Sequence, residues 1–175
     1  MKKEWDVLKI IRASGILLLL FVVNTIIVTN ILFLVKISIT SFHLFISLAI
    51  TLLEYYFLYR KKINIKQAIT SILLVILLLV LSVMISSKTY DLTWDGNTYH
   101  KTAIGSLKNG WNPVYEKVED FTQEKGNAID IDKNEQNRTW VNHYPKASWI
   151  FAANIYHLTN NIESGKVLGC LMILI

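Results

Sequence analysis

The sequence predicts an all-α fold: a polytopic transmembrane helical protein with an extracytoplasmic loop that carries short interfacial helices. Three observations support this fold. The chain of 175 residues is 53% hydrophobic, and its apolar residues gather in long uncharged runs rather than recurring with the period of a soluble helix. Basic residues cluster before the first run and after the second. A polar stretch after the third run has helical spacing but is too polar to cross a bilayer.

Three apolar runs predict the transmembrane helices. They cover about residues 15–35, 39–59 and 68–86, and Glu54 is the only charged residue inside them. A bilayer core about 30 Å thick requires roughly 20 helical residues, so each run is long enough to cross it. We therefore expect residues 1–86 to form three transmembrane helices.

The distribution of basic residues predicts the topology. Residues 1–86 carry nine Lys or Arg against three Asp or Glu, whereas residues 87–175 carry nine against ten. Basic clusters at the N-terminus and at 60–66 enclose the first two runs, and only Lys36 lies between those runs. Because basic residues are enriched in cytoplasmic segments, we expect a multi-pass protein of the cell membrane with a cytoplasmic N-terminus. The charge thus reports topology, and no basic patch indicates binding to nucleic acid.

Two ionisable residues of the second run, His43 and Glu54, are eleven positions apart and share a helical face. One interpretation is a proton relay, because ionisable groups inside a membrane are commonly functional. We favour another, in which His43 lies near the outer interface and Glu54 pairs with the cluster that begins at Arg60.

The polar stretch, residues 87–165, is expected to form the extracytoplasmic loop. A first amphipathic helix is predicted at about 97–109, because apolar residues recur there at near-helical spacing. A second helix is predicted at about 146–159, where Pro145 suits the start of a helix. Both segments are short enough to lie along the outer interface of the membrane.

The last apolar run is too short to cross a bilayer. We therefore expect residues 166–175 to begin a fourth transmembrane helix that is truncated. A C-terminal continuation or further membrane subunits would then complete the protein. The single cysteine, Cys170, excludes an intrachain disulfide.

Two carboxylates in the loop are the candidates for chemistry. Asp91 and Asp95 are four residues apart, so a helical segment would place both on one face. Such a pair can shift each other's pKa values or share a divalent cation. The alternative for Asp95 is an N-cap before the first helix of the loop, a common role of Asp.

Further polar residues could hold an anionic substrate. His100 is suited to bind phosphate or to carry a proton, and its alternative role is an interfacial histidine on the wet side of its helix. Arg138, His143 and Lys146 could hold phosphate groups, or else contact water and anionic lipid headgroups. No glycine-rich phosphate loop and no Cys/His cluster with zinc spacing is present in the sequence.

The order of these motifs resembles the first outer loop of GT-C class glycosyltransferases, multi-spanning enzymes that use polyprenyl-phosphate sugars. The resemblance rests on D-x-x-x-D-G-x-x-Y-H, on G-W-N-P and on a later Y-P. The matched residues are Asp91, Asp95, Gly96, Tyr99, His100, Trp111, Pro113, Tyr144 and Pro145. It implies a catalytic role for Asp95, with Asp91 second, and a substrate-binding role for Tyr99 and His100. Arg138, His143 and Lys146 are the further candidates for substrate binding.

Two functions remain open at this point. The first is a membrane-embedded glycosyltransferase, or the N-terminal fragment of one, that transfers a sugar from a polyprenyl-phosphate donor to a cell-envelope acceptor. The second is a non-catalytic multi-spanning protein that acts as an assembly partner or sensor. In either case the lipid bilayer is a partner.

Overall fold

All regular structure in the described part of the chain is helical. A computed structural model describes residues 7–125 and 135–174, and these contain no β-strand. Three helices in it are long and apolar enough to cross a membrane: α1 (Val7–Leu34), α2 (Ser41–Tyr59) and α3 (Ile65–Lys88). The all-α class and the presence of three such helices are confirmed for these residues.

The long helices extend past the apolar runs. α1 begins at Val7 rather than near residue 15, and α3 begins three residues before the expected residue 68. The start of α3 has a capping box, in which Asn64 Oδ1 accepts from the Gln67 N–H at 2.9 Å and Gln67 Oε1 accepts from the Asn64 N–H at 3.0 Å. An uncharged run marks the part that suits lipid, whereas the hydrogen-bonded helix continues into polar sequence.

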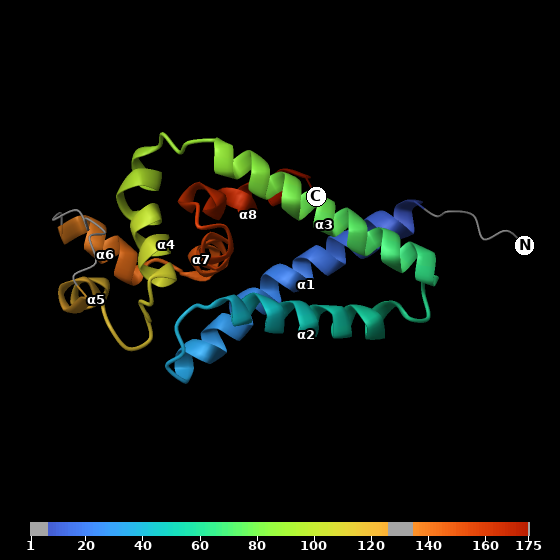
Figure 1. The fold of residues 1–175 in the computed structure, drawn as a ribbon, viewed down its shortest axis with the longest axis horizontal. Coiled ribbons are helices and arrows are strands. Elements are labelled where there is room, and N and C mark those ends of the chain that lie inside the picture. The colour runs from blue at the N-terminus through green and yellow to red at the C-terminus, as the bar shows by residue number, and fades with distance from the viewer. Residues whose placement is uncertain (1–6, 126–134, 175) are drawn as a thin grey trace, which may run out of the picture.

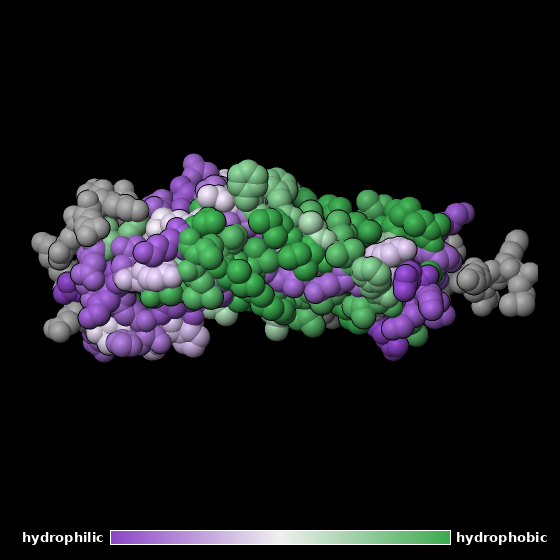
Figure 2. All heavy atoms as spheres, turned by 90° about the horizontal axis from the view of Figure 1, so that it is seen from below, coloured by the Kyte–Doolittle hydropathy of each residue, from purple (hydrophilic) through white to green (hydrophobic). Residues whose placement is uncertain are grey.

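The long helices form one end of an elongated molecule. The start of α1 and the α2–α3 connection lie far from the short helices, which gather at the opposite end (Figure 1). We call the described residues between 89 and 166 the head. An apolar band separates the polar surface of the head from a smaller polar area at the α2–α3 end (Figure 2). This distribution is typical of a protein whose middle lies in hydrocarbon.

Polar side chains join α1 to α2. Asn24 Nδ2 donates to Thr51 Oγ1 at 3.0 Å and to Glu54 Oε2 at 2.7 Å. His43 is fully buried, and its Nδ1 lies 3.3 Å from Thr29 Oγ1. Hydrogen bonds of this kind stabilise helix pairs in an apolar medium.

This arrangement corrects the interpretation that we favoured for Glu54. In the described part of the chain, Glu54 bonds to the neighbouring helix instead of pairing with Arg60. His43 lies near the start of α2 and has no exposed surface. Arg60 lies over the rings of Tyr56 and Phe57 instead, 5.9 and 5.2 Å from their centroids. The proton-relay interpretation stays a prediction.

The head is built from short helices. They are the π-helical turn η1 (Gly96–His100), α4 (Lys101–Lys108), α5 (Val118–Lys125), α6 (Glu135–His143), α7 (Ala147–Thr159) and the 3-10 turn η2 (Ile162–Lys166). The segment expected as one helix near 97–109 is thus η1 continued by α4. The segment expected to begin a fourth span forms α8 (Val167–Leu174), which lies beside α3 (Figure 1).

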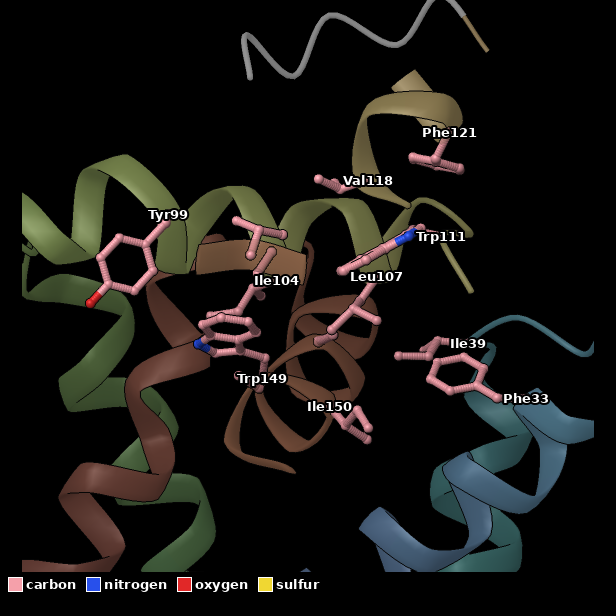
Figure 3. Packing of buried hydrophobic residues seen from close by; sticks show 14 residues of the cluster. Phe33, Ile39, Tyr99, Ile104, Leu107, Trp111, Val118, Phe121, Trp149 and Ile150 are labelled. Carbon is pink, nitrogen blue, oxygen red and sulfur yellow. The ribbon is translucent and has the colours of Figure 1, made fainter. Parts of the chain in front are cut away.

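α7 is the central helix of the head. Residues 149–155 are all buried, so α7 is enclosed by protein on every side along this stretch. This differs from the amphipathic helix that we expected along the membrane interface. Trp149 and Ile150 pack against α4 and the end of α1 (Figure 3). Phe151 and Ile155 pack among the long helices instead. α7 therefore ties the head to the apolar helices.

The head is also hydrogen-bonded to the end of α1. Asn112 Nδ2 donates to the Phe33 carbonyl at 2.9 Å, and the Tyr115 hydroxyl donates to the Leu34 carbonyl at 2.5 Å. These bonds satisfy carbonyls that a helix end leaves without an intrahelical partner. The head and α1 are thus fixed to each other at this end of the molecule.

Candidate functional site

The turn before η1 is closed by its own side chains. Asp91 Oδ1 accepts from the Thr93 N–H at 2.9 Å and from its hydroxyl at 2.7 Å. Thr93 Oγ1 accepts from the Gly96 N–H at 3.0 Å, the bond that an N-cap residue makes. Asp95 makes no side-chain cap bond, so the N-cap interpretation of Asp95 is wrong. Thr93 holds that position.

Asp91 is fixed against the helix that follows. A Cβ added at Gly96 would lie 1.9 Å from Asp91 Oδ2, so any other residue there would displace the Asp91 carboxylate from this position. The bonds from Thr93 lower the pKa of Asp91, which keeps the carboxylate charged and makes it a poorer base. Asp91 is therefore suited to shape the turn rather than to accept a proton.

Asp95 lies at the surface beside an aromatic cluster. Its carboxylate faces the hydroxyl of Tyr99, whose pKa is raised by burial and then by the charge of Asp95. The Tyr99 ring lies 5.2 Å from the Trp140 ring and 5.6 Å from the Tyr144 ring, centroid to centroid. Tyr99 is thus a core residue whose polar end meets Asp95, and the rest of the carboxylate is accessible.

Glu163 accepts hydrogen bonds from α4, from η2 and from the turn before η1. Its Oε1 lies 2.6 Å from Lys101 Nζ, its Oε2 lies 2.5 Å from Lys166 Nζ, and Oε2 also accepts from the Asp91 N–H at 3.2 Å. Burial alone would raise the pKa of Glu163, but the hydrogen bonds from Lys101, Lys166 and Asp91 lower it. η2 is thereby joined to α4 and to the turn before η1.

A pocket of about 410 Å³ opens beside this cluster. We call it the head pocket. Its polar lining residues include Asp91, His100, Lys101, Glu163 and Lys166. Its apolar lining residues include Ile104, Trp149, Ala152, Leu168 and Met172. Such a mixed lining suits a ligand with both a charged group and an apolar part.

His100 is hydrogen-bonded to Trp149, another residue that lines the head pocket. Trp149 Nε1 donates to His100 Nδ1 at 2.6 Å, and the two rings meet edge to face. Burial lowers the pKa of His100, and the charges of Asp95 and Asp91 offset only part of that effect. His100 is therefore neutral near pH 7.

The other predicted cations lie elsewhere. Arg138 and His143 line a different, larger pocket of about 830 Å³ between α5 and α6. Lys146 Nζ donates to the carbonyls of Asn142 and Tyr144, at 2.5 and 2.9 Å, and so caps the end of α6. Burial lowers the pKa of Lys146. Of the five predicted substrate-binding residues, Tyr99 meets Asp95 and His100 lines the head pocket together with Asp91.

Sequence reasoning did not find Lys101, Glu163 and Lys166 as site residues. Lys101 lies within the helix predicted at about 97–109, Glu163 lies near the end of the predicted loop, and Lys166 lies at the start of the truncated fourth span, and none of them was given a role. A signal exists in part, because Glu and Lys three residues apart are neighbours on a helical turn. Their meeting with Lys101 depends on how α4 packs against η2.

A divalent cation remains an open expectation. Among the residues that the structure describes, no group of three or more His, Cys, Asp or Glu side chains is placed to hold a metal ion. Asp91 Oδ1 is already bonded to Thr93. The described carboxylates therefore supply fewer protein ligands than a cation site commonly uses.

An apolar groove of about 370 Å³ opens among the long helices near α7. Its lining includes Phe21, Phe45, Leu48, Leu79, Val83 and Leu158. In a membrane such a groove is accessible to hydrocarbon chains.

We compared the chain with protein-family models, with curated proteins and with solved structures. None of the three comparisons finds a match. The functional argument therefore rests on the residues and their geometry.

Proposed function

We propose that this chain is a membrane-embedded glycosyltransferase, or the N-terminal part of one, which transfers a sugar from a polyprenyl-phosphate donor to a cell-envelope acceptor. The observation that carries the proposal is the head pocket, which is lined by two lysines and by apolar side chains, with the exposed carboxylate of Asp95 on the helical segment that borders it. A lipid-linked sugar phosphate has the matching chemistry, a charged group between a hydrocarbon chain and a polar sugar.

The proposed location follows from the positive-inside rule. The basic residues of the α2–α3 connection and of the N-terminal segment would face the cytoplasm, and the head would face the outside of the cell membrane. The apolar band between them matches a hydrocarbon layer (Figure 2). The pocket would then open at the level of the outer lipid headgroups, where a polyprenyl-phosphate sugar presents its phosphate.

The reaction assigns one proton acceptor. The Asp95 carboxylate takes the proton of the acceptor hydroxyl while the hydroxyl oxygen bonds to the anomeric carbon. The bond between that carbon and the phosphate oxygen breaks, and the polyprenyl phosphate leaves with the electron pair. Lys101 and Lys166 lie where they would offset the charge of the departing phosphate. The hydrocarbon chain of the donor would lie along the apolar surface of the long helices.

Asp95→Asn tests the proposal, because the amide keeps the shape of the side chain and cannot accept the proton. The assay measures transfer of radioactive sugar, in membranes that contain the protein, from a panel of polyprenyl-phosphate hexoses and pentoses. We expect the rate to fall by roughly 10²–10⁴-fold, the usual contribution of a general base. The matched control is Asp120→Asn, an exposed carboxylate of α5, which should leave the rate unchanged.

Two results would contradict this assignment. Full transfer by Asp95→Asn would remove Asp95 from the reaction. An absence of transfer by the wild-type protein with every donor would favour the non-catalytic alternative, an assembly partner or sensor. Equal loss in the Asp120→Asn control would indicate damage to the head rather than to the chemistry.

A further inference from the structure

The hydrogen bond between Trp149 and His100 fixes the position of a proton. An indole N–H can only donate, so Nδ1 of His100 must be the acceptor in the 2.6 Å bond. A neutral imidazole with an acceptor Nδ1 carries its proton on Nε2. Among the described residues, none accepts a bond from His100 Nε2. His100 lines the head pocket, so this N–H is available there to a ligand.

Two lysines of the pocket have an unused N–H each. Lys101 Nζ donates to Asn97 Oδ1 at 2.8 Å and to Glu163 at 2.6 Å. Lys166 Nζ donates to the carbonyl of Thr89 and to Glu163. An ammonium has three N–H donors, so each lysine keeps one beyond these described contacts. Together with His100, the residues that line the pocket have three N–H donors beyond their described bonds.

Charge alone would not hold an anion in this pocket. The two lysines are balanced by Glu163 and by the Asp91 carboxylate, which also lines the pocket. The summed charge of these four groups is therefore zero. Selective binding of an oxyanion then depends on N–H groups directed at its oxygens, as hydrogen bonds to charged acceptors are the stronger ones. A neutral donor is useful here, because it adds a bond without adding charge.

We propose that His100, fixed by Trp149 as the tautomer with the proton on Nε2, is a specificity-determining hydrogen-bond donor to the phosphate of a lipid phosphate bound in the head pocket. This inference rests on the proposed function for the class of ligand. In it Trp149 is a positioning residue, since it acts through His100. His100 does not carry a proton in the reaction, because the nitrogen that would release or receive it stays protonated while the ligand is bound.

Two amide substitutions distinguish the roles of the two ring nitrogens of His100. The amide nitrogen of Gln reaches the place of Nε2 and donates there, whereas the amide of Asn reaches only the place of Nδ1 and can accept from Trp149. We expect His100→Gln to bind a lipid phosphate within about threefold of wild type. We expect His100→Asn to bind it at least about tenfold more weakly, the loss of one bond to a charged acceptor.

The experiment measures the affinity of purified, detergent-solubilised protein for farnesyl phosphate, with farnesol and inorganic phosphate as the comparison ligands. Wild type should prefer farnesyl phosphate to farnesol by more than tenfold, and inorganic phosphate should bind more weakly than farnesyl phosphate because it lacks the apolar part. A stronger response to inorganic phosphate would assign the site to free phosphate and overturn the lipid assignment.

The outcomes that overturn the inference are distinct. If His100→Asn retains the affinity and His100→Gln loses it, only the bond to Trp149 matters, and the role of His100 is structural. Equal affinity of both variants and wild type would remove His100 from binding. If the Gln and Asn pattern holds but the wild-type protein transfers no sugar from any donor, the proposed function fails and the lipid-phosphate site stands.

A second measurement determines the tautomer of His100 in the protein without a ligand. The chain has four histidines, so ¹⁵N-histidine labelling gives few signals, and the His100→Gln variant identifies those of His100. We expect Nε2 in the protonated range and Nδ1 in the unprotonated range at pH 7.5. The reverse assignment would contradict the proposal.

Discussion

The apolar helices and the head are held together in different ways. The apolar windows of α1, α2 and α3 are 39%, 28% and 17% buried inside the protein, and small or polar side chains join α1 to α2. The head instead encloses a continuous core of aromatic and aliphatic side chains, and Trp111 in it is 1% exposed. Glu163 and its two lysines join the elements around that core.

This difference agrees with the solvent that we propose for each region, lipid around the long helices and water around the head. A helix in lipid gains little from burying apolar side chains against other helices, so polar and closely packed contacts decide its neighbours. A domain in water gains about 25 cal/mol for each Å² of apolar surface that it buries. Substitutions of the same type should therefore have large effects in the head and small effects on the outer face of the long helices.

The largest effect is expected for Phe151→Ala. Phe151 is fully buried where α7 meets the long helices, and its ring lies 6.1 Å from that of Phe21. Removing a buried Phe side chain costs about 3–5 kcal/mol, because apolar contacts are lost and a cavity remains. Denaturant unfolding of the protein in detergent, followed by tryptophan fluorescence, measures the change in the free energy of unfolding.

Phe45→Ala is the matched control for this comparison. Phe45 lies on α2 and is 63% exposed. In the apolar medium its loss should change the free energy of unfolding by less than about 1 kcal/mol. Similar costs for the two variants would show that the proposed contrast between the regions is incorrect.

The next effect concerns the ion pairs of the head. Glu163→Gln should destabilise the protein by about 2 kcal/mol, because its side chain is 8% exposed, both lysines lose the negative charge and one of them loses its acceptor oxygen. Lys101→Met should cost less, since that side chain is 23% exposed and Lys166 still pairs with Glu163. Thermal unfolding of the two variants and of the double variant measures the coupling. Additive effects would contradict a shared cluster.

The smallest effect is a pH dependence of stability. Burial lowers the folded-state pKa of His100 below its ordinary value of 6.5, so the unfolded chain binds this proton at higher pH than the folded protein does. The contribution is present above about pH 6.5 and is lost as the pH falls toward the folded-state pKa. We expect the thermal midpoint to decrease below pH 6.5, and to decrease less in His100→Gln. An identical decrease in both proteins would place the origin elsewhere.

The broad fold was accessible from the sequence because long apolar runs have few alternative interpretations. The ends of the long helices were less accessible, since Asn64 and Gln67 form a capping box outside the apolar run. The burial of α7 was not predicted. Asn154 donates to Thr29 of α1 at 3.1 Å, a contact that only the packing of α7 against α1 determines.

The candidate site was accessible in part. Asp91, Asp95 and His100 are close in sequence, so a single turn brings them together. Glu163 and Lys166 follow α7 in the sequence, whereas Lys101 precedes it. No local sequence pattern connects them.

The central claim is that the head with Asp95 lies outside the cell membrane. A cysteine at exposed Asn109, in a Cys170→Ser background, tests it with a membrane-impermeant maleimide. Lys61→Cys in the α2–α3 connection is the control for the opposite side. The account predicts that intact cells label position 109 and not position 61, and that broken cells label both. Labelling of position 109 only after the cells are broken would contradict the account.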